Sequence, residues 1–437
     1  MSAGGAAFDA VRTSWETSAD AAPEYPPLRS DVRCDVAVIG GGFTGLSAAL
    51  ALVGRGARVC VLEAGEIGGR ASGRNGGQVV PGLKPRADVV VARFGSERGQ
   101  RMLDFAHRLA DRTFALIAEH GIACSPTRNG WIQGAFSPKA RDDLKRRAEV
   151  NAKFGGDVEF VDRERVAELT GSHFHSGGML ERAAGAVHPL KFTRGLAQAA
   201  ARSGASLYEH SRVRSLERPT ARGMNRWMLS TEHGDVDAEQ VIMATDGYTD
   251  RLWPAAMQSI VNVNSAQLAT DPLTPALSAC VLPARAGVSE TRKITYYYRI
   301  DPEGRFVIGG RGPFSDSLDS ASVARIARAA LDRFPQLAGV QWRHGWACRV
   351  AMTLDDLPHL HALAPGLWTA IGYGGRGVAL AVGLGEAMAQ LALGIDGNQI
   401  DYPITPLRRV PVYPLRQPMA AAAITYYRIK DRLGFPS

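Results

Sequence analysis

The sequence predicts a mixed α/β fold with more than one domain, and three observations lead to this prediction. The chain has 437 residues, of which 45% are hydrophobic and 22% are charged, so it has a globular composition and the length of two or three domains. Residues 34–63 have the pattern of a strand, a helix and a second strand. Residues 292–312 alternate like two strands of a hairpin joined by the tetrapeptide DPEG.

Composition and charge exclude several classes of protein. No apolar run reaches the roughly 18 residues of a membrane-spanning helix, and residues 1–20 lack the pattern of a secretion signal. The five cysteines are scattered without the spacing of a zinc site or a disulfide framework. The net charge is +8, but arginine outnumbers lysine 44 to 7, which indicates a coding bias more than a binding surface. We therefore expect a soluble, cytoplasmic protein without a membrane span.

The remaining elements follow in chain order. Small and apolar residues at helical spacing predict a helix over 44–56, and residues 97–121 predict a long amphipathic helix with breaks. Further along we expect a helix, a glycine stop and a strand over 191–209, a strand ending in a turn over 237–248, and a strand, glycine turn and helix over 367–394.

The strand–helix–strand unit carries the pattern Gly40-x-Gly42-x-x-Gly45 directly after its first strand. Gly40 permits a tight turn, Gly42 lets the backbone approach a pyrophosphate, and Gly45 allows close packing of the helix on the strand. The start of the helix offers N–H groups and a positive dipole end to phosphates. Glu63 ends the second strand, where an acid accepts hydrogen bonds from a ribose. The unit therefore predicts a Rossmann-like domain that binds an adenine dinucleotide.

A second glycine-rich segment, GRASGRNGGQ at residues 69–78, indicates which dinucleotide is bound. We expect Ser72 to cap a new helical turn and Arg74 and Asn75 to face phosphate or a flavin edge. Gly76 and Gly77 allow the backbone to lie against a flat ring. A nicotinamide enzyme has little use for such a segment, whereas FAD is extended and its ring system must be flanked by protein.

Several motifs together resemble one family. The runs DVAVIGGGFTGLSAAL, LEAGEIGGRASGRNGGQ, VIMATDGYT, YYYRIDPEGRFVIGGRG and AIGYGGRGVALAVGLGEAMA are similar to the D-amino-acid-oxidase (DAO)-type FAD-dependent oxidoreductases. Within that group they most resemble the gamma-glutamylputrescine oxidoreductase branch, and the resemblance extends from Tyr25 to the end of the chain. The chain departs from the branch at Gly69 and Arg70, where an aromatic residue and a glycine are common.

The resemblance implies a two-domain fold, with a Rossmann-like FAD-binding domain and an antiparallel-sheet substrate domain. We expect the FAD-binding domain over 30–85, 175–255 and 345–437, the substrate domain over 86–174 and 256–344, and an N-terminal leader over 1–29.

The resemblance also implies roles for later residues. Val213 is expected beside adenine, Ala244 and Thr245 beside the dinucleotide, and the turn GYGGRG at 372–377 beside the flavin, where a helix start would stabilise its reduced form. The complete set expected to bind FAD is Gly40, Gly42, Phe43, Thr44, Gly45, Glu63, Ala64, Ser72, Arg74, Asn75, Gly76, Gly77, Gln78, Val213, Ala244, Thr245, Cys348, Gly372, Gly374, Gly375, Arg376, Gly377 and Val378.

Cys348 has two interpretations. Related monomeric sarcosine oxidases carry a cysteine joined to the flavin, followed by a similar run toward Thr-Leu-Asp, and Cys348 lies five residues before such a run. Covalent FAD is one reading, and a small buried thiol is the ordinary one.

On the substrate side, the strand over 292–300 separates by period two into an apolar face and a polar face. If the polar face lines the cavity, Tyr297 holds the substrate amine and Arg299 a carboxylate; the other reading is that this face meets solvent. Trp346 and Arg376 are further candidates for residues that line the substrate pocket. The histidine pairs 173/175 and 359/361 are expected on the surface, without a metal role, and no catalytic base is predicted.

The function implied by the resemblance is oxidation of an amine or amino acid by hydride transfer to flavin N5, giving an imine that hydrolyses. Reoxidation by O2 to H2O2, or by another acceptor, completes the cycle. A gamma-glutamylated diamine, pipecolate and sarcosine remain open as substrates. Two alternatives are an RNA-modifying flavoprotein, which would need a clustered basic face that the sequence lacks, and a non-enzymatic dinucleotide-binding sensor. We expect no nucleic-acid partner.

Overall fold

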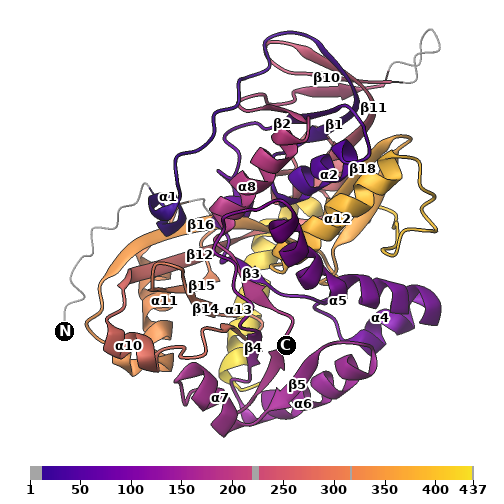
Figure 1. Ribbon diagram of the computed structural model, residues 1–437. Coiled ribbons are helices and arrows are strands. Elements are labelled where there is room, and N and C mark those ends of the chain that lie inside the picture. Colours follow the sequence, from indigo (N-terminus) through magenta and orange to yellow (C-terminus); the bar gives the residue numbers. More distant parts are fainter. Residues whose placement is uncertain (1–11, 219–225, 315–316, 436–437) are drawn as a thin grey trace.

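Two eight-stranded sheets lie side by side in the computed structural model, which describes residues 12–218, 226–314 and 317–435 (Figure 1). The first sheet has the order β17–β18–β11–β1–β2–β8, with β9 and β10 attached to β11. Its strands are β1 (Val32–Ile39), β2 (Val59–Leu62), β8 (Ser206–Tyr208), β9 (Ser215–Glu217), β10 (Trp227–Ser230), β11 (Asp235–Met243), β17 (His359–Ala364) and β18 (Leu367–Ile371).

The centre of the first sheet is parallel, as a strand–helix–strand unit requires. The strand β1 pairs in parallel with β2 on one side and with β11 on the other. Helices cover one face of this sheet and share one apolar core with it. They are α2 (Phe43–Val53), α5 (Ser96–Glu119), α8 (Pro189–Arg202) and α12 (Gly377–Ala392). The predicted α/β fold with a Rossmann-like unit is confirmed.

The second sheet has the order β16–β12–β15–β14–β13–β4–β6–β5, and its pairs are antiparallel except β13 with β4. Its strands are β4 (Trp131–Gly134), β5 (Val158–Val161), β6 (Gly178–Glu181), β12 (Val261–Pro272), β13 (Gly287–Glu290), β14 (Tyr297–Ile300), β15 (Arg305–Arg311) and β16 (Trp342–Met352). A short ribbon of β3 (Gln78–Val79) and β7 (Gly185–Ala186) stands apart from both sheets.

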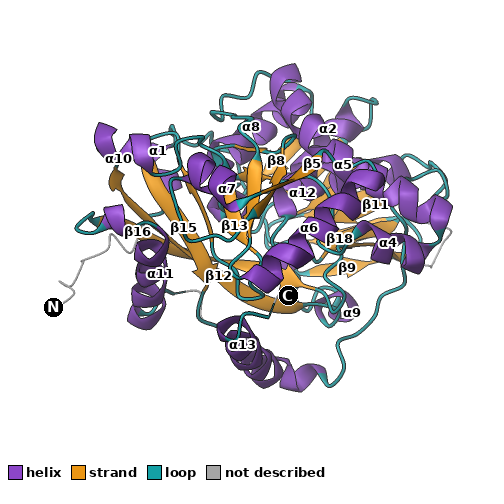
Figure 2. Ribbon diagram, turned by 90° about the horizontal axis from the view of Figure 1, so that it is seen from below, coloured by secondary structure: helices purple, strands orange, loops and turns teal. Residues whose placement is uncertain are grey.

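Further helices surround the second sheet, as Figure 2 shows from below. Helix α11 packs against its apolar face and closes a second core, while α13 runs beside β12. The remaining α-helices are α1 (Ser14–Ser18), α3 (Ala71–Arg74), α4 (Ala87–Phe94), α6 (Pro138–Lys153), α7 (Arg163–Thr170), α9 (Pro254–Met257), α10 (Pro275–Cys280), α11 (Ser320–Arg333) and α13 (Arg416–Arg432). The short 3-10 turns are η2 (Asp246–Tyr248), η3 (Pro335–Leu337) and η4 (Tyr413–Leu415).

The structure differs from the expected segmentation in several places. The predicted breaks in the helix over 97–121 are absent, because α5 runs unbroken and buries an apolar stripe. The hairpin strand expected from residue 292 begins only at Tyr297. The second sheet takes β6 and most of β16 from ranges that we expected in the FAD-binding domain.

The described part of the expected N-terminal leader packs into the fold. A capping box between Thr13 and Glu16 starts α1, and the Trp15 side chain is fully buried. The Trp15 ring lies 5.1 Å from the His188 ring and 6.0 Å from the Trp346 ring, centroid to centroid. Because Trp346 belongs to the second sheet and His188 precedes α8, this tryptophan packs between the two halves of the molecule.

No helix among the described residues combines the length and the apolar character that crossing a bilayer needs. Across the same residues, no group of three or more metal-ligating side chains comes together.

We predict that Trp15→Ala destabilises the protein by about 3 kcal/mol, because truncating a fully buried tryptophan leaves a cavity. Urea unfolding measures the change. The matched control is Tyr426→Ala on α13, whose side chain is 58% exposed and whose loss should change the free energy of unfolding by less than about 0.5 kcal/mol. Equal effects of the two substitutions would contradict the structural role given to α1.

Candidate functional site

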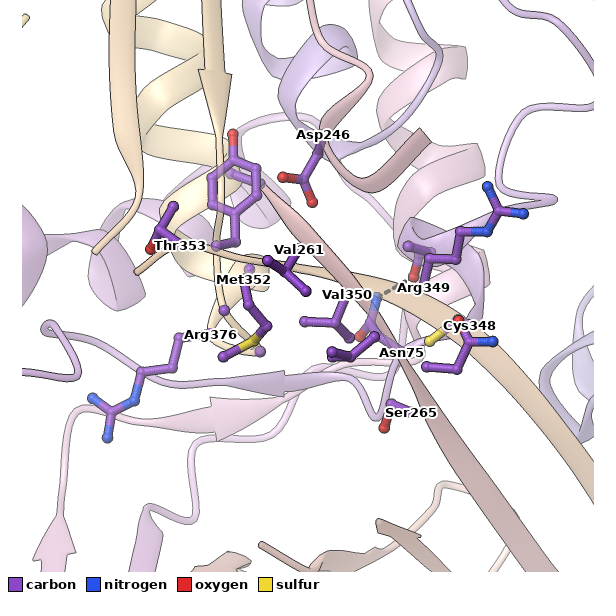
Figure 3. A pocket seen from close by; sticks show the side chains of 18 of the residues that line it. Asn75, Asp246, Val261, Ser265, Cys348, Arg349, Val350, Met352, Thr353 and Arg376 are labelled. Atoms are coloured by element: carbon purple, nitrogen blue, oxygen red, sulfur yellow. Dashed lines mark hydrogen bonds between the residues drawn. The ribbon is translucent and has the colours of Figure 1, made fainter. Parts of the chain in front are cut away.

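A large cavity of about 1590 Å³ lies between the two sheets and receives residues from both (Figure 3). It exceeds the ~300–1,000 Å³ of most small-ligand sites, so it has room for a dinucleotide and a substrate together. The predicted FAD-binding residues that line it are Gly40, Gly42, Phe43, Thr44, Glu63, Ala64, Ser72, Asn75, Gly76, Gln78, Val213, Ala244, Thr245, Cys348, Gly374, Gly375, Arg376, Gly377 and Val378. Four others, Gly45, Arg74, Gly77 and Gly372, lie outside its lining.

The glycine turn after β1 has the geometry that its sequence indicates. Gly40 has a φ of +109°, a conformation that other residues rarely adopt. A Cβ on Gly45 would stand 2.0 Å from the carbonyl oxygen of Gly40, so the helix packs directly on the turn. Gly42 precedes α2 without a side-chain cap of its own, which leaves the helix start facing the cavity.

Glu63 shapes this turn as well as lining the cavity. Its Oε2 accepts a hydrogen bond from the Gly41 N–H at 2.8 Å, and its Oε1 accepts one from the Gly65 N–H at 2.9 Å. The carboxylate, expected to receive ribose hydroxyls, thus also fixes two backbone segments at the ends of the parallel strands.

The expectation that Ser72 caps a new helix is wrong. Helix α3 begins at Ala71 after Arg70, and no side chain caps it. Instead, the Ser72 Oγ accepts a hydrogen bond from the Phe43 N–H at 3.0 Å and so partners the first residue of α2. Ser72 therefore caps α2 and not α3, the helix that we expected. The sequence could not indicate this, because the starts of α2 and α3 come together only in the folded chain.

Asn75 and Arg74 also turn to protein partners. The Asn75 Nδ2 donates to the carbonyls of Ala71 and Ser72, and its Oδ1 accepts from the Gly77 N–H. The Arg74 Nη2 lies 3.4 Å from the Glu16 Oε1 on α1 and outside the cavity lining. Asn75 thus folds the glycine-rich segment, while Arg74 ties it to the N-terminal helix.

Two predicted substrate residues lie behind the cavity wall. The structure corrects the carboxylate role expected for Arg299, which is 4% exposed and whose Nη1 donates to the carbonyls of Gly76, Gly77 and Val187 at 3.2, 3.1 and 2.9 Å. The Trp346 Nε1 donates to the Arg74 carbonyl at 2.8 Å. Neither residue lines the cavity; both hold the glycine-rich segment in place.

Tyr297 lines the cavity from β14. Its hydroxyl lies 2.7 Å from the Ser265 Oγ on β12. A Cβ on Gly309, between these two strands, would stand 2.1 Å from the Tyr297 ring, so the ring lies flat over that glycine. Burial raises the pKa of Tyr297, so the phenol stays neutral.

Arg376 lies at the end of the cavity opposite Cys348 in Figure 3. Its guanidinium carbon stands 5.1 Å from the centre of the Trp131 ring, and its Nη1 donates to the carbonyls of Pro81 and Leu83. Burial lowers the pKa of Arg376 to about 9 and that of nearby Lys84 to about 8. No motif in the sequence pointed to Lys84, which lies in an irregular segment.

Cys348 lines the cavity from β16 and is 7% exposed. Burial raises the pKa of its thiol to about 12, with a smaller opposing effect of Arg74. The side chain is therefore a neutral thiol at physiological pH.

An apolar wall formed by Val261, Val263, Val350 and Met352 was missed in the sequence. These residues alternate with others on the neighbouring strands β12 and β16, so their side chains share the face that meets the cavity. Figure 3 shows Val261, Val350 and Met352 together near Asn75. Apolar residues such as valine recur throughout the chain, so these four could be recognised as one wall only from the pairing of β12 with β16.

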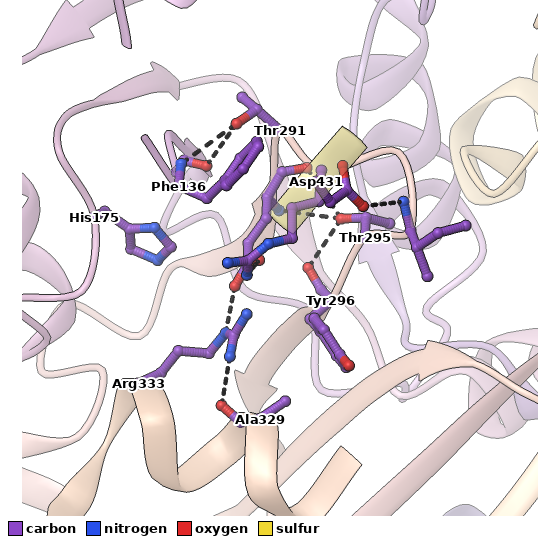
Figure 4. A network of polar contacts seen from close by, with 12 residues as sticks. Phe136, His175, Thr291, Thr295, Tyr296, Ala329, Arg333 and Asp431 are labelled. Carbon is purple, nitrogen blue, oxygen red and sulfur yellow. Dashed lines mark hydrogen bonds and ion pairs between the residues drawn. The ribbon is translucent and has the colours of Figure 1, made fainter. Parts of the chain in front are cut away.

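A buried polar network lies beside the cavity, and Figure 4 shows Arg333, His175 and Tyr296 within it. Glu290 is an ion-pair partner of both Arg333 and Arg292. Burial opposes its charge, but the two arginines outweigh burial and lower the pKa of Glu290. We expected His175 and His361 on the surface, and this is wrong for both. His175 is 1% exposed, and its Nε2 lies 2.6 Å from the Tyr298 hydroxyl. His361 is 3% exposed.

Comparisons with known proteins find relatives that cover most of the chain. The family model described as FAD dependent oxidoreductase matches residues 35–391. A probable oxidoreductase OrdL of Rhizobium meliloti is 31% identical over 431 residues, covering 96% of this chain and 97% of the relative. The gamma-glutamylputrescine oxidoreductase of Escherichia coli is 30% identical over 433 residues, covering 96% and 98%.

Solved structures share the fold. The crystal structure of glycine oxidase from Geobacillus kaustophilus superposes with a TM-score of 0.71 at 23% identity, covering 83% of this chain and 95% of the other. An L-amino acid deaminase from Proteus myxofaciens gives a TM-score of 0.71 at 20% identity, covering 86% and 93%.

We predict that Asp246→Ala weakens FAD binding at least about 10-fold, because the Asp246 Oδ1 accepts the Gly372 N–H at 2.8 Å and so holds the second glycine turn. Asp246→Asn is the matched control, since asparagine keeps the acceptor and tolerates the φ of +38°. Titration of the apoprotein with FAD, followed by flavin fluorescence, measures both. Weaker FAD binding by Asp246→Asn than by Asp246→Ala would contradict the role given to the Asp246 hydrogen bond.

Proposed function

The chain belongs to the FAD-dependent oxidoreductase family, and on that premise we propose that it oxidises the carbon–nitrogen bond of an alkylamine. The observation that carries the proposal is one cavity walled by the dinucleotide turn of the first sheet and by Tyr297 and the apolar wall of the second. This arrangement would bring a cofactor held by one sheet against a substrate held by the other.

Residues on the first-sheet side of the cavity fit FAD. The start of α2 would bind the pyrophosphate, because it faces the cavity at Gly42, which has no side chain to block the approach, and because Ser72 partners the Phe43 N–H while the N–H groups that follow can meet the phosphates. Glu63 would accept the ribose, and Asn75, Gly76 and the turn over 372–377 would flank the ring system. The chemistry supplied by FAD is acceptance of a hydride from the carbon next to nitrogen.

The chain's own residues would prepare the amine for this reaction. An alkylammonium has a pKa near 10.4, so most of it arrives protonated. Transfer to the apolar wall disfavours the charged form, and the neutral Tyr297 hydroxyl offers the free amine a hydrogen-bonding partner. Exclusion of water by the apolar wall would serve the same step, with the product imine hydrolysing after release to an aldehyde or oxo-acid and an amine.

A gamma-glutamylated diamine is the substrate that we propose ahead of a small amino acid such as pipecolate or sarcosine. The cavity is large, and its apolar wall matches an extended methylene chain. The relative at 30% identity carries gamma-glutamylputrescine in its name, whereas the glycine oxidases match at lower identity. We further propose O2 as the electron acceptor, so that one amine oxidised to imine is balanced by one O2 reduced to H2O2.

Anaerobic mixing of the yellow holoprotein with candidate amines tests the function directly. We expect gamma-glutamylputrescine to bleach the visible flavin spectrum fastest, ahead of L-pipecolate, sarcosine, D- and L-amino acids and simple polyamines. Admission of air should restore the colour and produce one H2O2 for each amine consumed. A holoprotein that no amine bleaches would contradict amine oxidation, and a chain unable to take up FAD would contradict the cofactor assignment.

We also propose that FAD is held without a bond to Cys348, because burial keeps its thiol neutral and a covalent link needs the thiolate. Acid precipitation of the holoprotein should release all of the colour into the supernatant, from the wild type and from Cys348→Ala alike. A yellow wild-type pellet that the substitution decolourises would show the covalent alternative instead.

A further inference from the structure

The C-terminal helix α13 carries an apolar row that faces away from the protein. Among the residues that the structure describes, seven of the 13 large hydrophobic side chains that are exposed lie within residues 412–435. Soluble proteins rarely gather exposed apolar side chains in one place, so such a group marks an interaction site. Those on α13 and its two cap residues are 49% to 68% exposed: Leu415, Met419, Tyr426, Ile429 and Leu433.

These side chains form one continuous row along the helix. Starting at Leu415, they and Ala422 follow one another at steps of four, three, four, three and four residues, which keeps them on one side of an α-helix. The opposite side of α13 lines the cavity with Ala420, Ala423 and Tyr427. No residue of α13 is buried, and Figure 2 shows the helix at the lower edge of the molecule. The helix therefore has an inner face towards the cavity and an outer face without a partner.

Hydrogen bonds from the rest of the protein fix the direction of the outer face. The two carboxylate oxygens of Asp431 accept the backbone N–H groups of Lys293 and Ile294, each at 3.2 Å. Just after the helix, the Ser137 Oγ donates to the Gly434 carbonyl at 2.8 Å. These contacts turn the acidic side chain of the helix inward and leave the apolar row outward.

The charged side chains around the apolar row are almost all cationic. Residues 408–435 hold six arginine and lysine side chains and one acidic side chain, so this segment has a net charge of +5 against +8 for the whole chain. On a helical projection, Lys430 and Arg432 lie on either side of the row. An apolar row flanked by cations is typical of a helix that lies in the plane of a membrane surface.

Two other occupants fit this face less well. In a pair of α13 helices from two copies of the chain, the flanking cations of one copy would lie near those of the other and repel them. A nucleic acid would match the cations, but its phosphate backbone offers no apolar surface to Ile429 and Leu433. An anionic bilayer matches both features, because its headgroups attract the cations and its acyl boundary buries the apolar side chains.

We propose that the outer face of α13 binds the surface of a membrane that contains anionic lipids, with the helix lying in the plane of the interface. The apolar row enters the boundary between headgroups and acyl chains, and Lys430 and Arg432 contact the headgroups. Because the inner face of the same helix lines the cavity, this contact places one wall of the cavity beside the lipid surface. The proposal depends neither on the identity of the amine nor on its oxidation.

Co-sedimentation of the holoprotein with vesicles tests the proposal. Vesicles of phosphatidylcholine alone are compared with vesicles of two parts phosphatidylcholine to one part phosphatidylglycerol. We expect binding to the anionic vesicles to be at least about 20-fold tighter, and to weaken at least about fivefold when the ionic strength rises from about 0.1 M to about 1 M. Equal binding to both kinds of vesicle, or binding to neither, would overturn the proposal.

Substitutions in the apolar row show whether α13 is the part that binds. Ile429→Ser combined with Leu433→Ser should weaken binding to the anionic vesicles at least about 10-fold. The matched control is Leu393→Ser combined with Ile395→Ser, which removes the same residue types at the end of α12, where they are 38% and 37% exposed, and should change binding less than about twofold. Equal binding by the two double variants would contradict the role given to α13.

Substitutions of the cations complete the test. Arg428→Gln combined with Arg432→Gln should weaken binding about 10-fold, whereas Arg29→Gln combined with Arg55→Gln, two exposed arginines outside α13, should leave it within about threefold. Binding that requires the α13 arginines but not the apolar row would indicate a purely ionic contact and overturn the proposal. In sedimentation velocity without lipid, a dimer that the apolar-row variant dissociates would instead assign the row to a second copy of the chain.

Discussion

The arrangement of the site depends on a buried guanidinium that holds one glycine-rich segment against the second sheet. Arg299 extends from β14, and its Nη1 donates to three carbonyls, two of them in the segment that follows β2. Burial lowers the pKa of Arg299 to about 10, but its Nη1 and Nε donate four hydrogen bonds to backbone carbonyls, whose dipoles compensate the charge. The two sheets are thereby joined at the edge of the cavity.

The contact between the glycine-rich segment and the second sheet requires backbone atoms to lie very close to Arg299, and glycine permits this because it has no side chain. Gly77 has a φ of +67°, and a Cβ there would stand 2.1 Å from the Val187 carbonyl oxygen and 2.7 Å from the Arg299 Nη1. The N-terminal helix closes the same joint from outside, with Trp15 over Arg299 and Glu16 beside Arg74. The segment thus lines the cavity with Asn75 and Gly76 while its outer side is packed by both halves of the molecule.

Charge is distributed unevenly around the cavity, and this distribution separates the roles of its residues. Arg376 and Lys84 lie with Glu181 and Asp356 nearby, so carboxylates partly offset the positive charge at that end. Among the described residues, the charged neighbours that, after burial, lower the pKa of Arg311 are Arg428 and Arg325. The cavity also has an apolar wall. Such a wall lowers the pKa of an alkylamine, so that the neutral amine is favoured, and it accommodates methylene groups. One cavity thus combines an apolar wall with cationic side chains.

The sequence by itself determined the dinucleotide unit, because its steric demands are local: a positive φ at Gly40 and a helix packed on it at Gly45 admit few residue types. A series of different motifs, in the order typical of the family, also predicted the family and its two-domain fold. Only the tertiary structure decided which side chains face the cavity. Arg299 and Arg311 are both arginines near strand ends, yet one donates to the backbone carbonyls of a distant segment and the other lines the cavity. Hydrogen-bond partners 112 or 222 residues apart leave no pattern in a single sequence, since strand register alone brings them together.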